Sequence, residues 1–126
     1  MSREHAEHNE TLCDYIAVSG EWPDWVVTTA FYAALHYARA ALFPRTVDDR
    51  EYANFDVYWE RTREEFRQDK HQRLCQLVFE HMRPGYDAYR FLMNESKTAR
   101  YNEYRTPVAI AHRARCALQT VKDLCR

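Results

Sequence analysis

The stretch that decides the fold is residues 22–43, WPDWVVTTAFYAALHYARAALF. Its apolar residues lie on most of the circumference of a helix, so the pattern predicts a central helix with neighbours on several sides. Pro23 suits the first turn of that helix, and Pro44 ends it. Threonine, histidine and arginine interrupt residues 26–43, which are also rich in alanine. We therefore expect a buried helix and no membrane span.

The composition agrees with a single helical domain over residues 1–126. The chain is 46% hydrophobic and 14% aromatic, which excludes disorder, and two Gly and four Pro are too few for an all-β sandwich. A net charge of −1 gives no overall attraction to nucleic acid, so such binding would need a local basic patch. The four cysteines lack a CxxC pair, and the N-terminus does not resemble a signal peptide. We expect free thiols and a cytoplasmic location.

Helices are also predicted on both sides of the central one. Residues 3–18 form the first, with Leu12, Tyr15 and Ile16 facing inward, and Ser19-Gly20 stops it. Another covers residues 86–104, and the last starts at Thr106-Pro107, with Thr as N-cap and Pro in the first turn.

Residues 48–82 are too long and too polar in the middle for one helix. We expect a break near Gln68, because Asp69 and Gln72 have the spacing of a capping box that opens a new helix. Short connections favour antiparallel neighbours. The predicted fold is all-α, an up-and-down bundle of four to five helices.

Two polar residues inside the central helix form the first candidate site. His36 and Arg39 lie three residues apart and share one face, where an imidazole and a guanidinium suit a phosphate or an RNA backbone. Alternatively, His36 is a core histidine bonded to a neighbouring helix, and Arg39 extends outward to water.

Two further segments place basic groups on helices. Lys70 and His71 follow Asp69 at a helix start, where anions bind, although they could simply face water. Ser96, Arg100 and Tyr101 offer a hydroxyl, a guanidinium and a ring for phosphate and base, or else form a helix–helix seam bridged by the arginine.

Arg105 and His112 are the candidate catalytic pair. Histidine can act as general base or acid in attack by a 2′-hydroxyl, and arginine can stabilise charge on the phosphate. Plain solvent exposure of His112 is the alternative, because the pattern places it on the polar face of the last helix.

Three pairs have a helical spacing that could supply two metal ligands: His5 with His8, His71 with Cys75, and His112 with Cys116. None comes with a carboxylate-rich partner motif, so we expect no metal and no other cofactor.

The order of these segments resembles the HEPN family (higher eukaryotes and prokaryotes nucleotide-binding domain). FYAALHYARAAL at residues 31–42 resembles its aromatic-Tyr-Ala-Ala-x-His-x-Ala-Arg-Ala-Leu helix. Residues 69–71 lie where many members have a Ser-His-Lys-like element, and LMNESKTARY at residues 92–101 resembles a third family segment. The similarity spans roughly residues 10–123.

The resemblance implies a four- to five-helix bundle that often forms a homodimer. It also implies work on RNA or nucleotides in prokaryotes, as ribonuclease toxins beside a nucleotidyltransferase-type antitoxin, defence effectors or non-catalytic relatives. Catalytic members carry an Arg, four to six residues and a His. Arg105 and His112 fit at the upper limit, with Pro107 inside the motif and Thr106 where Asn, Asp or His is typical.

We therefore expect a homodimer that binds RNA or a nucleotide, with metal-independent cleavage by Arg105 and His112 in a cleft shared by two protomers. The alternative is a non-catalytic module that recruits a partner protein. An open basic cleft would favour the first, and a closed polar seam the second. Near-neutral charge and the lack of a short glycine-containing helix-turn-helix argue against a DNA-binding regulator.

Overall fold

The all-α class is confirmed: the computed structural model describes residues 2–125 and is 77% helix. The helices are α1 (Ser2–Ala17), α2 (Pro23–Leu42), α3 (Phe55–Thr62), α4 (Lys70–His81), α5 (Tyr86–Tyr101) and α6 (Val108–Leu124). Two strands, β1 (Arg45–Val47) and β2 (Arg50–Tyr52), form an antiparallel hairpin between α2 and α3. Short 3₁₀ turns occupy Arg63–Glu65 and Arg83–Gly85.

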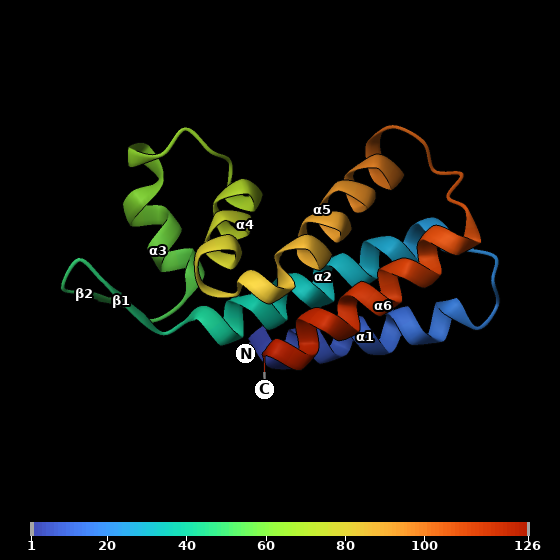
Figure 1. The fold of residues 1–126 in the computed structure, drawn as a ribbon, viewed down its shortest axis with the longest axis horizontal. Helices are drawn as coiled ribbons and strands as arrows, with labels where there is room; N and C mark the ends of the chain where they lie inside the picture. The colour runs from blue at the N-terminus through green and yellow to red at the C-terminus, as the bar shows by residue number, and fades with distance from the viewer. Residues whose placement is uncertain (1, 126) are drawn as a thin grey trace.

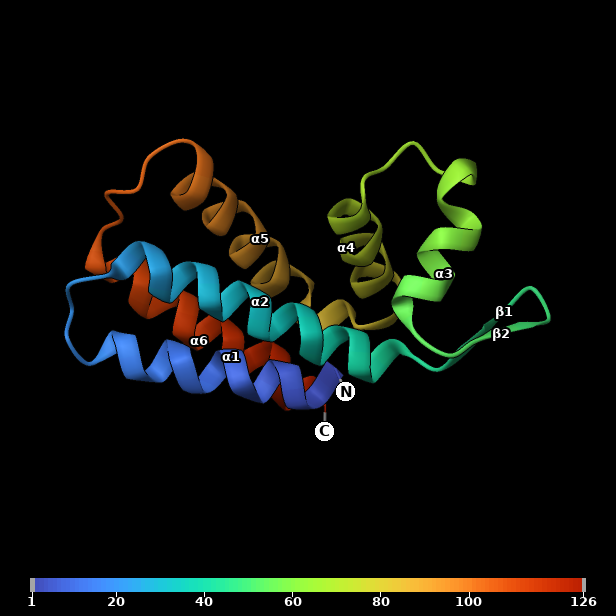
Figure 2. The ribbon, with the colours of Figure 1, turned by 180° about the vertical axis from the view of Figure 1, so that it is seen from behind.

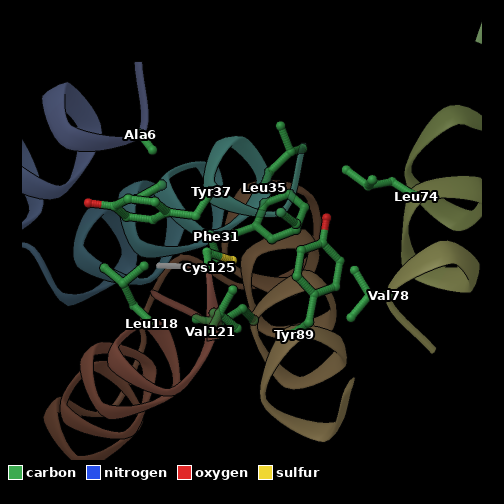
Figure 3. Packing of buried hydrophobic residues seen from close by; sticks show 14 of the residues in the cluster. Ala6, Phe31, Leu35, Tyr37, Leu74, Val78, Tyr89, Leu118, Val121 and Cys125 are labelled. Carbon is green, nitrogen blue, oxygen red and sulfur yellow. The ribbon is translucent and has the colours of Figure 1, made fainter. Parts of the chain in front are cut away.

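Helix α2 is the centre of the fold and packs against α1, α4, α5 and α6. Figures 1 and 2 show α1 and α6 running along α2, with the hairpin and α3 beyond its C-terminal end. The two ends of the chain lie side by side, where Arg3 donates a hydrogen bond to the carbonyl of Cys125 at 3.0 Å. Rings from α2 and α5 meet aliphatic side chains of α4 and α6 in the core (Figure 3).

The prediction that α2 is buried is confirmed. Small side chains such as Ala30, Ala34 and Ala38 are fully buried and allow neighbouring helices to approach closely. Thr28 and Thr29 are also buried, and each hydroxyl donates to the carbonyl four residues earlier, which satisfies the polar atom inside the core. Among residues 2–125, no helix combines the length and apolarity needed to cross a membrane.

The predicted inner face of α1 is wrong for Leu12 and Tyr15, which are 43% and 79% exposed. Ile16 is half-buried and packs against the core, as predicted. The fully buried residues are Ala6 and Cys13, whose short side chains let α1 lie close against α2. Helix α1 therefore turns the face with its small residues towards α2, and this leaves its largest apolar side chains facing solvent.

The β-hairpin was also not predicted, because the sequence analysis began a helix at residue 48. Asp48 and Asp49 have φ values of 51° and 64°, as in a two-residue turn that matches the twist of antiparallel strands. Aspartate tolerates this left-handed region better than most residues. The helix instead starts at Phe55, after Asn54 accepts a hydrogen bond from the backbone N–H of Val57 at 2.9 Å.

The predicted capping box is confirmed. The Asp69 carboxylate accepts from the N–H of Gln72 at 2.8 Å, and the Gln72 side chain accepts from the N–H of Asp69 at 3.0 Å. In contrast, Thr106 does not cap α6: its hydroxyl donates to the carbonyl of Tyr104, and Pro107 is the residue before the helix.

Candidate functional site

The seven residues predicted to bind substrate lie in one region, where α2, α4 and α5 meet. We call this set the basic cluster: His36, Arg39, Lys70, His71, Ser96, Arg100 and Tyr101. Tyr32 of α2 contacts Arg100, and Asp56 of α3 contacts both Arg39 and Lys70.

Arg100 is held by groups from two helices. Its Nη1 donates to the Tyr32 hydroxyl at 2.8 Å, and its Nη2 donates to Ser96 Oγ at 3.3 Å. The Tyr101 ring lies beside the guanidinium, with 4.9 Å between Arg100 Cζ and the ring centroid. Within residues 2–125, all the partners that the structure gives this guanidinium are neutral. Arg100 is therefore oriented without being neutralised.

Ser96 is fully buried and Ala99 is 7% exposed, so the α5 face that carries Arg100 packs directly on its neighbours. The seam bridged by the arginine is therefore present between Ser96 and Tyr32, with Arg100 half-buried at its edge. Binding of phosphate and base by this segment stays a prediction.

Asp56 joins two other cations of the cluster. Its carboxylate lies 2.7 Å from Lys70 Nζ and 3.4 Å from Arg39 Nη1. The hydrogen bond from Lys70 is the main cause that holds the pKa of Asp56 below its ordinary range; burial opposes it, and the charge of Arg39 lowers the pKa further. One carboxylate thus pairs with two cations, so Asp56, Arg39 and Lys70 together keep a net positive charge.

The two histidines of the cluster are neutral at pH 7. Burial, followed by the nearby His5 and Arg39, lowers the pKa of His36 to about 4. Its ring stacks on the ring of His5 at 3.7 Å, and its Nδ1 is buried without a hydrogen-bond partner among residues 2–125. Burial is also the main cause that lowers the pKa of His71; Asp69 opposes it, and the charges of Arg100 and Arg39 lower the pKa a little further. Both imidazoles are therefore uncharged groups that can donate or accept a hydrogen bond.

An open hollow of about 280 Å³ adjoins the cluster between the start of α4 and the second half of α5. Its walls include His71 and Gln72 on one side and Lys97, Arg100 and Tyr101 on the other. This volume lies just below the range of about 300–1,000 Å³ that is typical of small-molecule sites. The Asp69 carboxylate already caps the N-terminus of α4. An anion in this hollow would therefore be bound by side chains and not by the backbone N–H groups of the helix start.

Arg105 and His112 are not brought together within one chain. The Arg105 guanidinium pairs with Glu103 at 3.0 Å on a fully exposed loop, while His112 Nε2 lies 3.8 Å from the sulfur of Cys116 on α6. They line two separate hollows, which share Gly20 and Pro23 as wall residues. A catalytic role for the pair therefore stays a prediction that needs a second chain.

Sequence analysis missed three residues of this region: Tyr32, Asp56 and His5. Tyr32 lies one helical turn before His36, so helical spacing could have placed it on the same face. His5 and Asp56 come from other helices, and no local pattern connects them with His36 or Arg39.

An exposed apolar surface was missed as well. It lies where the α1–α2 connection approaches the start of α6, and we call it the apolar end. Its members are between 53% and 88% exposed: Tyr15, Val18, Trp22, Tyr104 and Val108. Three neighbouring hollows connect these residues into one surface, because Trp22 lines two of the hollows and Pro23 lines the second and the third. Arg105 lines one of these hollows and His112 lines another.

Comparisons of the chain with protein-family models, with curated proteins and with solved structures gave no match.

Proposed function

We propose that this protein binds the phosphate groups of a nucleotide or of an RNA backbone at the basic cluster. The observation that carries the proposal is Arg100, a half-buried guanidinium fixed by Tyr32 and Ser96, with only neutral partners, at the wall of an open hollow. All three nitrogens of this guanidinium already donate to Ser96, Tyr32 or Tyr101, so it offers phosphate oxygens its positive charge and its remaining N–H group.

The other groups of the hollow suit the rest of a nucleotide. Lys97 adds a positive charge beside Arg100, and neutral His71 can donate or accept a hydrogen bond. The Tyr101 ring is part of a residue that is 72% exposed, so its face is available for stacking on a base. Arg39 and Lys70 are already paired with Asp56, and their contribution is a weaker, longer-range attraction.

The test is binding of a fluorescein-labelled single-stranded RNA oligonucleotide, followed by anisotropy, with ATP and GTP as competitors. Arg100→Gln should weaken binding roughly 10- to 100-fold, which is the loss of a charge-assisted hydrogen-bonded pair. Arg83→Gln is the matched control, since Arg83 is exposed on a 3₁₀ turn and its loss changes the net charge equally. Equal affinities of the two variants would contradict the site, and circular dichroism checks that both are folded.

The apolar end supports a second function, self-association. Its five residues expose roughly 800 Å² of surface, backbone included, which is about what one partner contributes to a stable protein–protein interface. We propose that a second copy of this chain covers it. Sedimentation should show a dimer for the wild type and a monomer for Val18→Asp combined with Trp22→Ser. A monomeric wild type at micromolar concentration would refute this.

A dimer through this end would place the Arg105 and His112 of one chain near those of the other. Cleavage of RNA by the pair, a setting in a toxin–antitoxin or defence system, and a nucleotidyltransferase-type partner are hypotheses that follow from the HEPN resemblance.

A further inference from the structure

We propose that His112 and Cys116 form a two-ligand site for a thiophilic divalent cation of the zinc class. The proposal is independent of phosphate binding at the basic cluster, and it differs from the expectation of no metal drawn from the sequence. It rests on the positions of the two donor atoms on α6.

Three pairs of histidine or cysteine residues have a helical spacing, and their side chains are placed differently in the structure. His5 stacks on His36, and His71 turns its ring towards Phe31, with ring centroids 5.5 Å apart. Only in the third pair do the donor atoms face one another, with His112 Nε2 at 3.8 Å from Cys116 Sγ.

That separation suits one shared metal ion. Zinc binds sulfur at about 2.3 Å and imidazole nitrogen at about 2.0–2.1 Å, so tetrahedral geometry places the two donors about 3.5 Å apart. A few tenths of an ångström separate this value from the observed distance, and a small side-chain rotation on the exposed face of α6 closes it. The helix thus presents both ligands nearly in position.

Cys116 is also the accessible thiol of the chain. Cys13, Cys75 and Cys125 are buried, and burial raises the pKa of Cys75 and of Cys125 to about 11, which disfavours the thiolate that a metal requires. Cys116 is exposed, so an ion can reach its sulfur from solvent.

The neighbouring charged groups are already paired. Arg115 binds Asp14 at 3.1 Å, and Glu10 accepts hydrogen bonds from Tyr37 at 2.6 Å and Lys122 at 3.1 Å. Arg115 therefore repels a cation less than a free guanidinium would, and the two carboxylates are not free to complete the coordination. Among residues 2–125, no group of three or more potential ligands exists, so water or a second chain must fill the remaining positions.

Sulfur and imidazole donors select zinc, cobalt or cadmium over magnesium or calcium, which prefer oxygen. Binding converts the Cys116 thiol into a thiolate and releases its proton, while His112 binds through neutral Nε2.

Cobalt is the probe, because a cobalt–thiolate bond gives a charge-transfer band in the near ultraviolet. Metal-free protein is titrated with Co²⁺, and Zn²⁺ is then added to displace it. We expect a saturable band that Zn²⁺ removes and Mg²⁺ does not, absent in Cys116→Ser and requiring at least tenfold more Co²⁺ in His112→Ala. His8→Ala, which changes an exposed histidine on α1, is the control and should behave as the wild type.

Native mass spectrometry gives the stoichiometry. One ion per chain supports a site completed by water, and one ion per two chains supports a site completed by the second copy. Absence of the band, or a band that persists in Cys116→Ser, would overturn the proposal. Both substitutions are on the exposed face of α6, so the variants should fold, and neither result bears on RNA binding by Arg100.

Discussion

Mild acid should destabilise the protein through His36. In the folded chain burial and the adjacent His5 and Arg39 lower the pKa of this imidazole to about 4, while Asp56 opposes them weakly. In the unfolded chain it returns to the ordinary value of 6.5. Between these values the unfolded state binds the additional proton. The stabilisation is therefore complete above about pH 6.5 and is lost as the pH falls towards 4.

The size of the effect follows from the two pKa values of His36. From about pH 7.5 to about pH 5, a change from 6.5 to about 4 corresponds to a loss of about 2 kcal/mol in the free energy of unfolding. Because the side chain is only half-buried, solvent screening reduces this to about 1 kcal/mol.

Urea unfolding of the wild type and of His36→Gln at both pH values measures this loss. Groups remote from His36 titrate equally in both proteins, so the difference between their pH dependences reports on His36 and its neighbours His5 and Asp56. The wild type should lose about 1 kcal/mol more than His36→Gln on acidification. His8→Gln, on the exposed side of α1, should lose as much as the wild type. Equal losses in wild type and His36→Gln would refute the assignment of the shifted pKa to this buried, stacked ring.

Arg73→Ala should lower the free energy of unfolding by about 2–4 kcal/mol in urea, because it leaves a buried hydroxyl unpaired. The Arg73 guanidinium, in a residue 8% exposed, donates to Tyr58 at 2.8 and 3.0 Å; full stability of Arg73→Lys would show that charge alone suffices. Asp69→Ala removes the capping box of α4 and should cost about 1 kcal/mol, seen as a lower Tm; an unchanged Tm would mean that packing alone holds this helix start. Total RNA incubated in chelator, which keeps His112 free of metal, should be cleaved by the wild type and left intact by Arg105→Ala and His112→Ala; intact RNA with the wild type would rule out cleavage and leave binding.

Local sequence patterns predicted most of the helices. The apolar circumference of α2, the capping box at Asp69 and the helix that begins at Tyr86 each depend on residues within a few positions of one another, which the helix period places directly. The hairpin was missed because Asp48-Asp49 is a weaker turn signal than Asn-Gly. The inner face of α1 was missed because its periodicity points to large apolar residues, whereas the contact with α2 selects small ones.

The sequence by itself determined the all-α class, the buried central helix and the residue types of the basic cluster. Tertiary structure alone decided which polar groups meet: Arg100 with Tyr32, 68 positions earlier, and Asp56 with both Arg39 and Lys70. The reason is geometric. A periodic pattern states which face of a helix is apolar, but contacts between helices also depend on how each is rotated and shifted along its neighbour. Packing of the whole core sets both quantities.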